Sequence, residues 1–185
     1  MASILNVDQI NNAAGTSALT IDSSGNVNIP GHVLQVESAT KTDVFTTTST
    51  SNTPITGLSV TLTPASTSSK VLVTFNINAG CSNNASAVRI FKNGSVITGA
   101  IGDNITTNEW TVNVYNGGDD SNSTPNWSMS FLDSPSTTSA TTYALYVAQV
   151  QGGGTFVLND QTSQVRGTPF SGTSASTITA MEIAQ

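Results

Sequence analysis

Charged residues are scarce in this chain, and basic residues are scarcer than acidic ones. Of 185 residues only 9% are charged, and five Lys and Arg stand against eleven Asp and Glu, which gives a net charge of −6. No basic stripe that would bind nucleic acid can be drawn, and the negative charge repels phosphate and anionic lipid. The composition therefore argues against a partner that is a nucleic acid or an anionic membrane surface.

Cysteine and histidine occur once each. Because Cys81 has no second cysteine to pair with, no intrachain disulfide forms, and we expect a protein assembled in a reducing cytoplasm. Cys81 is interpreted as a small, half-buried apolar residue. His32 has no nucleophile motif beside it and is interpreted as a turn or packing residue. With no Cys/His cluster for zinc, we predict no metal and no cofactor.

Long apolar runs and helix signals are also missing. No stretch approaches the ~20 apolar residues of a membrane span. The opening MASILNVDQINN has no basic start, and Asn6 and Asp8 interrupt its apolar residues. We therefore expect neither membrane insertion nor a secretory signal. Around Val7 to Ala14 the spacing predicts at most one helical turn.

What the chain does contain is period-two alternation rich in Val, Ile, Thr and aromatic residues, which indicates β-strands. In 70–78 the residues Val71, Val73, Phe75 and Ile77 share one face, whereas the face of the last strand that points inward is ambiguous. Asn93-Gly94 predicts a tight hairpin turn, and Thr53-Pro54 is among the expected breaks. The expected strands are 33–36, 42–48, 57–63, 70–78, 86–92, 95–98, 109–115, 127–132, 141–150, 155–158 and 176–183.

About ten short strands with frequent turn signals predict an all-β fold, an antiparallel β-sandwich of jelly-roll-like form, over residues 37–185. Residues 1–36 differ, because their short apolar pieces are too sparse to build a core. Within them, ALTIDSSGNVNIPG predicts a hairpin that is marginal alone and needs a cover. We expect 1–36 to be a short extended and hairpin segment that docks on another surface, with Gly31-His32 at the joint.

Acidic residues are candidates for a calcium site or for the catalytic pair of a glycosidase, but their spacing in the sequence matches no known motif for either. Calcium would need two loops brought together, and an EF-hand pattern is absent. A glycosidase would need two carboxylates in one groove, for which Glu109 with Asp119, Asp120 or Asp133 is the available set. The loop carboxylates considered for calcium are Asp103, Asp119, Asp120 and Asp160.

Large aromatic residues are candidates for stacking on sugar rings if they lie at loop ends. Trp110, Tyr115 and Trp127 are the candidate glycan contacts, although the alternation favours a core position for each aromatic side chain. These residues make a glycan-binding module one of the functions to test.

Several segments resemble a known group of proteins. The opening ILNVDQINNAAGTSALTIDSSGNVNIPG is similar to the N-terminal segment of tail-fibre-like and virion structural proteins of marine and cyanobacterial tailed phages. The later pieces LTPASTSSKVLV, VRIFKNGSVI, SMSFLDSPSTTSATTYALYV and STITAMEIAQ resemble the β-rich domain that follows it. The resemblance implies a homotrimeric virion protein whose N-terminal part attaches to another virion protein and whose sandwich faces outward.

The resemblance and the residues together give an ordered set of functional hypotheses. The first is a non-enzymatic homotrimer in the virion, assembled in the host cytoplasm, that serves as a short tail fibre or spike for host attachment. The alternative is a capsid decoration protein, the second alternative is a module binding host-surface polysaccharide, and a depolymerase is the third. The assembly interface is expected at Leu19, Ile21, Val27 and Ile29, packed around a threefold axis.

Overall fold

The computed structural model describes residues 7–21, 23, 25, 27–82, 85–102, 110–115, 124–150, 152–160 and 173–185. Nearly all regular structure in this part of the chain is β-strand, as expected. The strands are β1 (Gln9–Asn11), β2 (Ser17–Ile21), β3 (Val27–Asn28), β4 (Val33–Lys41), β5 (Phe45–Thr47), β6 (Thr53–Leu62), β7 (Lys70–Ser82), β8 (Ala85–Lys92), β9 (Ser95–Val96), β10 (Val112–Tyr115), β11 (Asn126–Asp133), β12 (Thr141–Gln149), β13 (Thr155–Leu158) and β14 (Ser176–Ile183), with one 3-10 turn, Thr98–Ala100.

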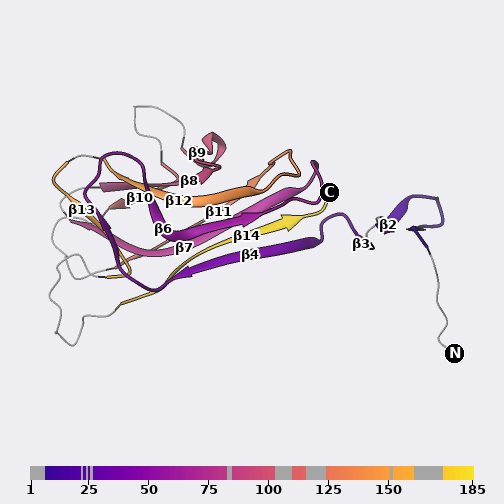
Figure 1. Cartoon of the computed structure of the whole chain (residues 1–185), viewed down its shortest axis with the longest axis horizontal. Helices are drawn as coiled ribbons and strands as arrows, with labels where there is room; N and C mark the ends of the chain where they lie inside the picture. The colour runs from indigo at the N-terminus through magenta and orange to yellow at the C-terminus, as the bar shows by residue number, and fades with distance from the viewer. Residues whose placement is uncertain are drawn as a thin grey trace.

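Two antiparallel sheets face each other and form a sandwich (Figure 1). One sheet has the order β10-β8-β12-β6, with β9 beside β8. In the other sheet the first part of β7 pairs with β14, and its last part pairs with β13. Strand β14 pairs in turn with β4, and β13 pairs with β5. Strand β11 pairs with the opposite edge of β7.

The connectivity is that of a jelly roll. If β4 with β5 counts as the first long strand and β13 with β14 as the eighth, one sheet has the order first, eighth, third, sixth. The other sheet then has the order second, seventh, fourth, fifth. Apart from the fourth and fifth strands, which are neighbours in one sheet, consecutive strands thus alternate between the two sheets, as in double-sheet jelly rolls. The expected fold class is confirmed.

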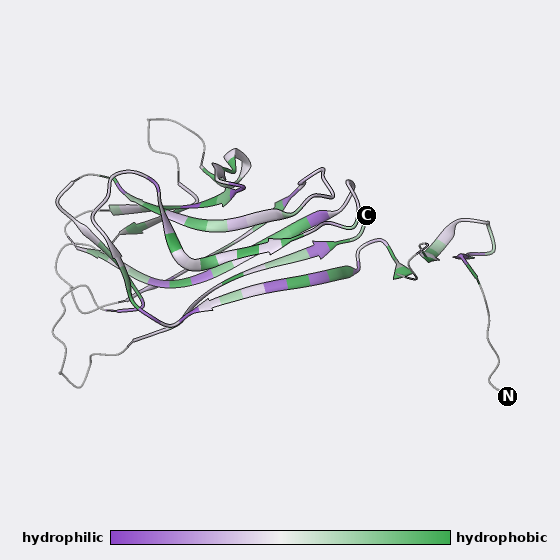
Figure 2. Ribbon diagram, in the orientation of Figure 1, coloured by the Kyte–Doolittle hydropathy of each residue, from purple (hydrophilic) through white to green (hydrophobic). Residues whose placement is uncertain are grey.

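Inward-facing apolar side chains of both sheets form a single core. Apolar and polar residues alternate along the long strands (Figure 2), as a sandwich requires. The predicted inward face of β7 is confirmed, since Val71, Val73, Phe75 and Ile77 are all buried. In β14 the ambiguous pattern resolves: Ser176, Ile178, Ala180 and Glu182 point inward and their neighbours point out.

Three sequence predictions were wrong in detail. The strand expected at 33–36 was too short, because β4 pairs with β14 as far as Lys41. Thr53-Pro54 is no break either: Pro54 lies in β6, an edge strand where a residue without an N–H is tolerated. The predicted helical turn near the N-terminus is instead strand β1.

The Asn93-Gly94 turn is confirmed. Both residues have positive φ, 49° and 80°, which the tight turn between β8 and β9 requires. The side chain of Asn93 also accepts a hydrogen bond from the backbone N–H of Thr142, 2.8 Å away, and so ties the turn to β12.

Candidate assembly surface

Residues before β4 form a separate three-stranded sheet, in the order β1-β2-β3, that extends beyond one end of the sandwich (Figure 1). We call this the N-terminal sheet. The β1–β2 turn is built around Asn12, whose Oδ1 accepts hydrogen bonds from the backbone N–H groups of Ala14 and Thr16. Gly15 follows with φ of 83°, a conformation that glycine adopts without strain.

The strand register gives the N-terminal sheet one apolar face. Ile10 pairs with Leu19, and Ile21 pairs with Val27. Directly paired residues share a face, and so do residues two apart in a strand, so all four side chains lie together. We call these four residues the apolar face. Ile10 remains 46% exposed and Val27 50% exposed, whereas Leu19 and Ile21 are half-buried, so the chain itself covers this face only in part.

The predicted assembly residues therefore come together, with two differences. Ile29 lies just beyond β3 and is half-buried, outside the paired register. Ile10 was missed, because a three-residue strand carries too short a pattern to be recognised. The hairpin of β2 and β3, in which Ile21 pairs with Val27, was anticipated correctly from the alternation.

The opposite face of the N-terminal sheet is polar. Gln9 and Thr20 pair directly and are both exposed. One side of this small sheet thus suits water and the other does not. Because an isolated sheet of this size is only marginally stable, its apolar face calls for a cover.

The joint between the two parts is fixed to the end of the sandwich. The N–H of Gly31 donates to the carbonyl of Ala184, 2.8 Å away, and the N–H of Ala184 donates to the carbonyl of His32, 2.9 Å away. His32 is exposed and serves as this turn residue, the role expected for it.

A groove of about 650 Å³ runs between the N-terminal sheet and the sandwich, lined on one side by Thr20 and Val27 and on the other by Gln35, Ser69 and Glu182. Glu182 is fully buried, and its carboxylate accepts hydrogen bonds from the N–H of Ala65, 2.7 Å away, and from the Gln35 side chain. These contacts join β4, β14 and the β6–β7 connection near the joint.

The candidate glycan residues do not form one site. Trp127 packs against the core, and its Nε1–H donates to the carbonyl of Ala79, 2.9 Å away. Trp110 is half-buried beside a second groove of about 440 Å³, lined also by Asn52 and Arg89. Tyr115 ends β10, and the placement of its side chain lies outside the described residues.

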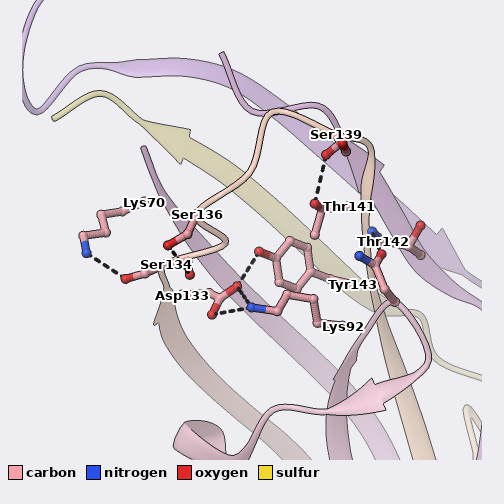
Figure 3. A network of polar contacts seen from close by, with 10 residues as sticks. Lys70, Lys92, Asp133, Ser134, Ser136, Ser139, Thr141, Thr142 and Tyr143 are labelled. Atoms are coloured by element: carbon pink, nitrogen blue, oxygen red, sulfur yellow. Dashed lines mark hydrogen bonds and ion pairs between the residues drawn. The ribbon is translucent and has the colours of Figure 1, made fainter. Parts of the chain in front are cut away.

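Asp133 lies between the two sheets, beside a groove of about 370 Å³ that it lines together with Lys92 and Leu132. It is 6% exposed, and its carboxylate accepts hydrogen bonds from Tyr143 Oη at 2.7 Å and from Lys92 Nζ at 2.9 Å (Figure 3). Tyr143 and Lys92 lie on β12 and β8 of the other sheet. Asp133 therefore ties the two sheets together, and its expected partners Glu109, Asp119 and Asp120 lie outside the described residues.

The remaining candidates are buried or undescribed. Asp160 lies just after β13 and is 7% exposed, and Asp103 lies outside the described residues. Cys81 is fully rather than half buried, and its Sγ–H donates to Gln149 Oε1 at 3.3 Å.

Neither a metal-binding cluster nor a membrane-spanning helix occurs in the described ranges. No group of three His, Cys, Asp or Glu side chains there is arranged to hold an ion. Nor does any helix in that part of the chain have the length and apolar character to cross a bilayer.

The Tyr143 environment predicts a pH dependence. Burial, reinforced by the hydrogen bond to Asp133, raises the pKa of the Tyr143 phenol above its ordinary value. Above pH of about 10 an unfolded chain ionises this tyrosine while the folded chain keeps it protonated, so the unfolded state binds fewer protons and stability falls. We expect the free energy of unfolding to drop by up to about 1.4 kcal/mol per pH unit there from this group.

Urea denaturation at several pH values between neutral and alkaline checks this, with Tyr143→Phe as the comparison. The difference between the two proteins isolates Tyr143 from the lysines that titrate in the same range. If wild type and Tyr143→Phe lose stability in parallel above pH of about 10, the assignment is wrong.

In comparisons with known proteins, no protein-family model and no curated protein sequence matches the chain.

Proposed function

We propose that this chain is a non-enzymatic structural protein of a tailed-phage particle, a homotrimer that serves as a short tail fibre or spike. Residues 1–36 join the copies and attach them to another virion protein, and the sandwich is displayed outward for contact with the host surface.

The observation that carries the proposal is the apolar face of Ile10, Leu19, Ile21 and Val27, which the chain itself leaves partly uncovered. Burial of a Leu, Ile or Val side chain yields about 1.5–3 kcal/mol, so covering several of them in each copy supplies a substantial drive for association. A small sheet can obtain that cover from identical copies arranged around a closed rotation axis. Three such sheets around one axis bury the three apolar faces against one another.

Two further points support a virion role. The opening segment and four later pieces resemble tail-fibre-like proteins in the order in which they occur there. The jelly roll is also an architecture of viral capsid proteins and lectins, although a fold alone does not fix a function.

The copy number of the chain in purified particles tests the virion role. Antibody raised against the protein is expected to label the tail at few positions. Dense labelling over the head would instead favour the capsid decoration alternative. Particles that contain none of the protein would refute both.

Substitution in the apolar face tests its part in assembly. We expect Ile21→Asp to convert the trimer to monomer, because a carboxylate buried between copies costs several kcal/mol unless it is paired. The matched control is Thr20→Asp, which places the same charge on the exposed polar face of the same strand. Light scattering on the full chain reads out the mass, and a trimer that survives Ile21→Asp would remove this face from the interface.

A second candidate, a glycan-binding module, rests on the groove beside Trp110. An aromatic ring next to the polar side chains of Asn52 and Arg89 is a combination that suits a sugar. In a glycan array, we expect Trp110→Ala to lose whatever host polysaccharide the wild-type chain retains. Equal retention by both proteins would place the contact elsewhere.

A further inference from the structure

The outer face of the sheet that contains β4, β14, β7 and β11 carries an apolar row at one end. Met181 pairs with Val36 on one side and with Leu72 on the other, and Leu72 pairs in turn with Leu132. These four residues therefore lie side by side across four strands. They come from four distant segments of the chain, so the row exists only because of the register.

A second row extends the first. Ile183 pairs with Val33 and with Lys70, so Val33 and Ile183 lie next to the first row, toward the joint with the N-terminal sheet. We call Val33, Val36, Leu72, Leu132, Met181 and Ile183 the end patch. In the other direction the face turns polar at once, with Ser38, Thr179, Thr74 and Ser130 in the next row.

Half of the end patch is exposed in the single chain, and Leu72, Met181 and Ile183 are half-buried. Val33, Val36 and Leu132 are 52–53% exposed, and they are three of the five large hydrophobic residues that are exposed within the described ranges. The other two are Ile10 and Val27 of the apolar face. The uncovered apolar side chains of this part of the molecule thus gather on two adjoining surfaces, one on each side of the joint.

The charge pattern suits contact between identical molecules. Asp133 and Glu182 point into the interior. Glu37, paired with Ala180, lies on the inward-facing side of the edge strand β4, where it is exposed to solvent. The outward positions of the four strands therefore carry no carboxylate, in a protein with a net charge of −6. Copies can bring this face together without opposing their negative charges.

A cation at the margin adds attraction. Lys70 lies in the second row, and its Nζ donates to the uncharged Ser134 Oγ, 2.7 Å away. Residues 1–32 contain two Asp and neither Lys nor Arg. The N-terminal part of one copy and the patch margin of the next are thus complementary in charge.

We propose that the end patch is a second contact between copies of this chain, continuous with the apolar face. This inference rests on the proposed self-assembly, and it adds that the sandwiches touch one another as well as the N-terminal sheets. Val33 follows Ile29 by only four residues, and the joint is hydrogen-bonded to the end of β14. Copies gathered at their N-terminal sheets therefore bring their end patches to the same axis.

Substitution of Leu132 tests the proposal on the full chain. We expect Leu132→Asp to weaken association at least about 100-fold, since an unpaired carboxylate is then buried in each contact. Leu132 is exposed in the single chain, so the fold should tolerate the change. The control is Ser128→Asp, which adds the same charge on the same strand and face but away from the patch. Sedimentation equilibrium over a dilution series gives the association constants, and circular dichroism confirms the fold.

The outcomes separate this inference from the proposed function. A trimer weakened by Leu132→Asp and unaffected by Ser128→Asp supports the end patch. If neither Leu132→Asp nor Val36→Asp changes the association constant, the proposed contact at the end patch is wrong. The virion role is decided separately, by the labelling of particles. A wild-type chain that stays monomeric overturns it as well, because no second copy then occupies the patch.

Discussion

Asp133→Ala is expected to lower the free energy of unfolding by about 3 kcal/mol, among the largest effects of any single substitution in this chain. The buried carboxylate holds a buried tyrosine hydroxyl and a lysine ammonium from the opposite sheet. Its removal leaves Tyr143, which is fully buried, without its acceptor and Lys92 without its counter-ion. The Lys92 side chain is 31% exposed, so water compensates part of the loss and the cost stays at the lower end of the range for a broken buried pair.

Chemical denaturation of Asp133→Ala, Asp133→Asn and Ser134→Ala measures this effect. Asparagine keeps an acceptor for Tyr143 and is expected to cost less than alanine. Ser134→Ala changes the next residue, which is exposed, and is expected to stay within about 0.5 kcal/mol of wild type. If Asp133→Ala cost no more than Ser134→Ala, the bridge between the sheets would contribute nothing.

The second large effect is expected at Asn159, just after β13. Its Nδ2 donates to the backbone carbonyls of Lys41 and Asp43, at 2.8 and 3.1 Å, and its Oδ1 accepts from Ser176 Oγ at 2.6 Å. The fully buried side chain thus joins the end of β4 to the start of β14. Asn159 also has φ of 62°, in the left-handed region that asparagine tolerates better than alanine does.

We expect Asn159→Ala to cost about 3 kcal/mol, from lost hydrogen bonds in the interior and from backbone strain of about 1 kcal/mol. Asn159→Gly separates the two causes, because glycine removes the side chain but accepts the positive φ. Thermal and urea unfolding of both variants give the comparison. An alanine variant as stable as wild type would mean that these bonds are dispensable.

Much of the fold could be predicted from the sequence, because strand alternation and turn chemistry are local. The inward face of β7, the bounds of β13 and β14, and the Asn93-Gly94 turn all follow from residues close together in the chain. The continuation of β4 to Lys41 could not be predicted, since residues 37–41 are mostly polar and are held in the sheet by β14, more than 130 residues away. The break expected at Thr53-Pro54 was wrong for a similar reason, because only the order of strands in the sheet shows that Pro54 lies in an edge strand.

The assembly surface likewise has a part that could be predicted from the sequence and a part that could not. Leu19, Ile21 and Val27 were predicted together because one hairpin contains them. The end patch was not predictable, because each strand contributes one or two apolar residues on a face that otherwise carries Ser, Thr and Asn. The inward positions of Asp133 and Glu182 were not predicted either, since Lys92 lies 41 residues from Asp133 and Gln35 lies 147 residues from Glu182 in the chain.

The mass of the full-length protein in solution tests the central claim most directly, that copies of this chain cover its exposed apolar surfaces. Light scattering over a range of concentrations should give three times the chain mass of 19.0 kDa, falling to one chain mass for Ile21→Asp combined with Leu132→Asp. A wild-type chain that remains at 19.0 kDa at every concentration would contradict the account, and a different protein would then have to cover these surfaces.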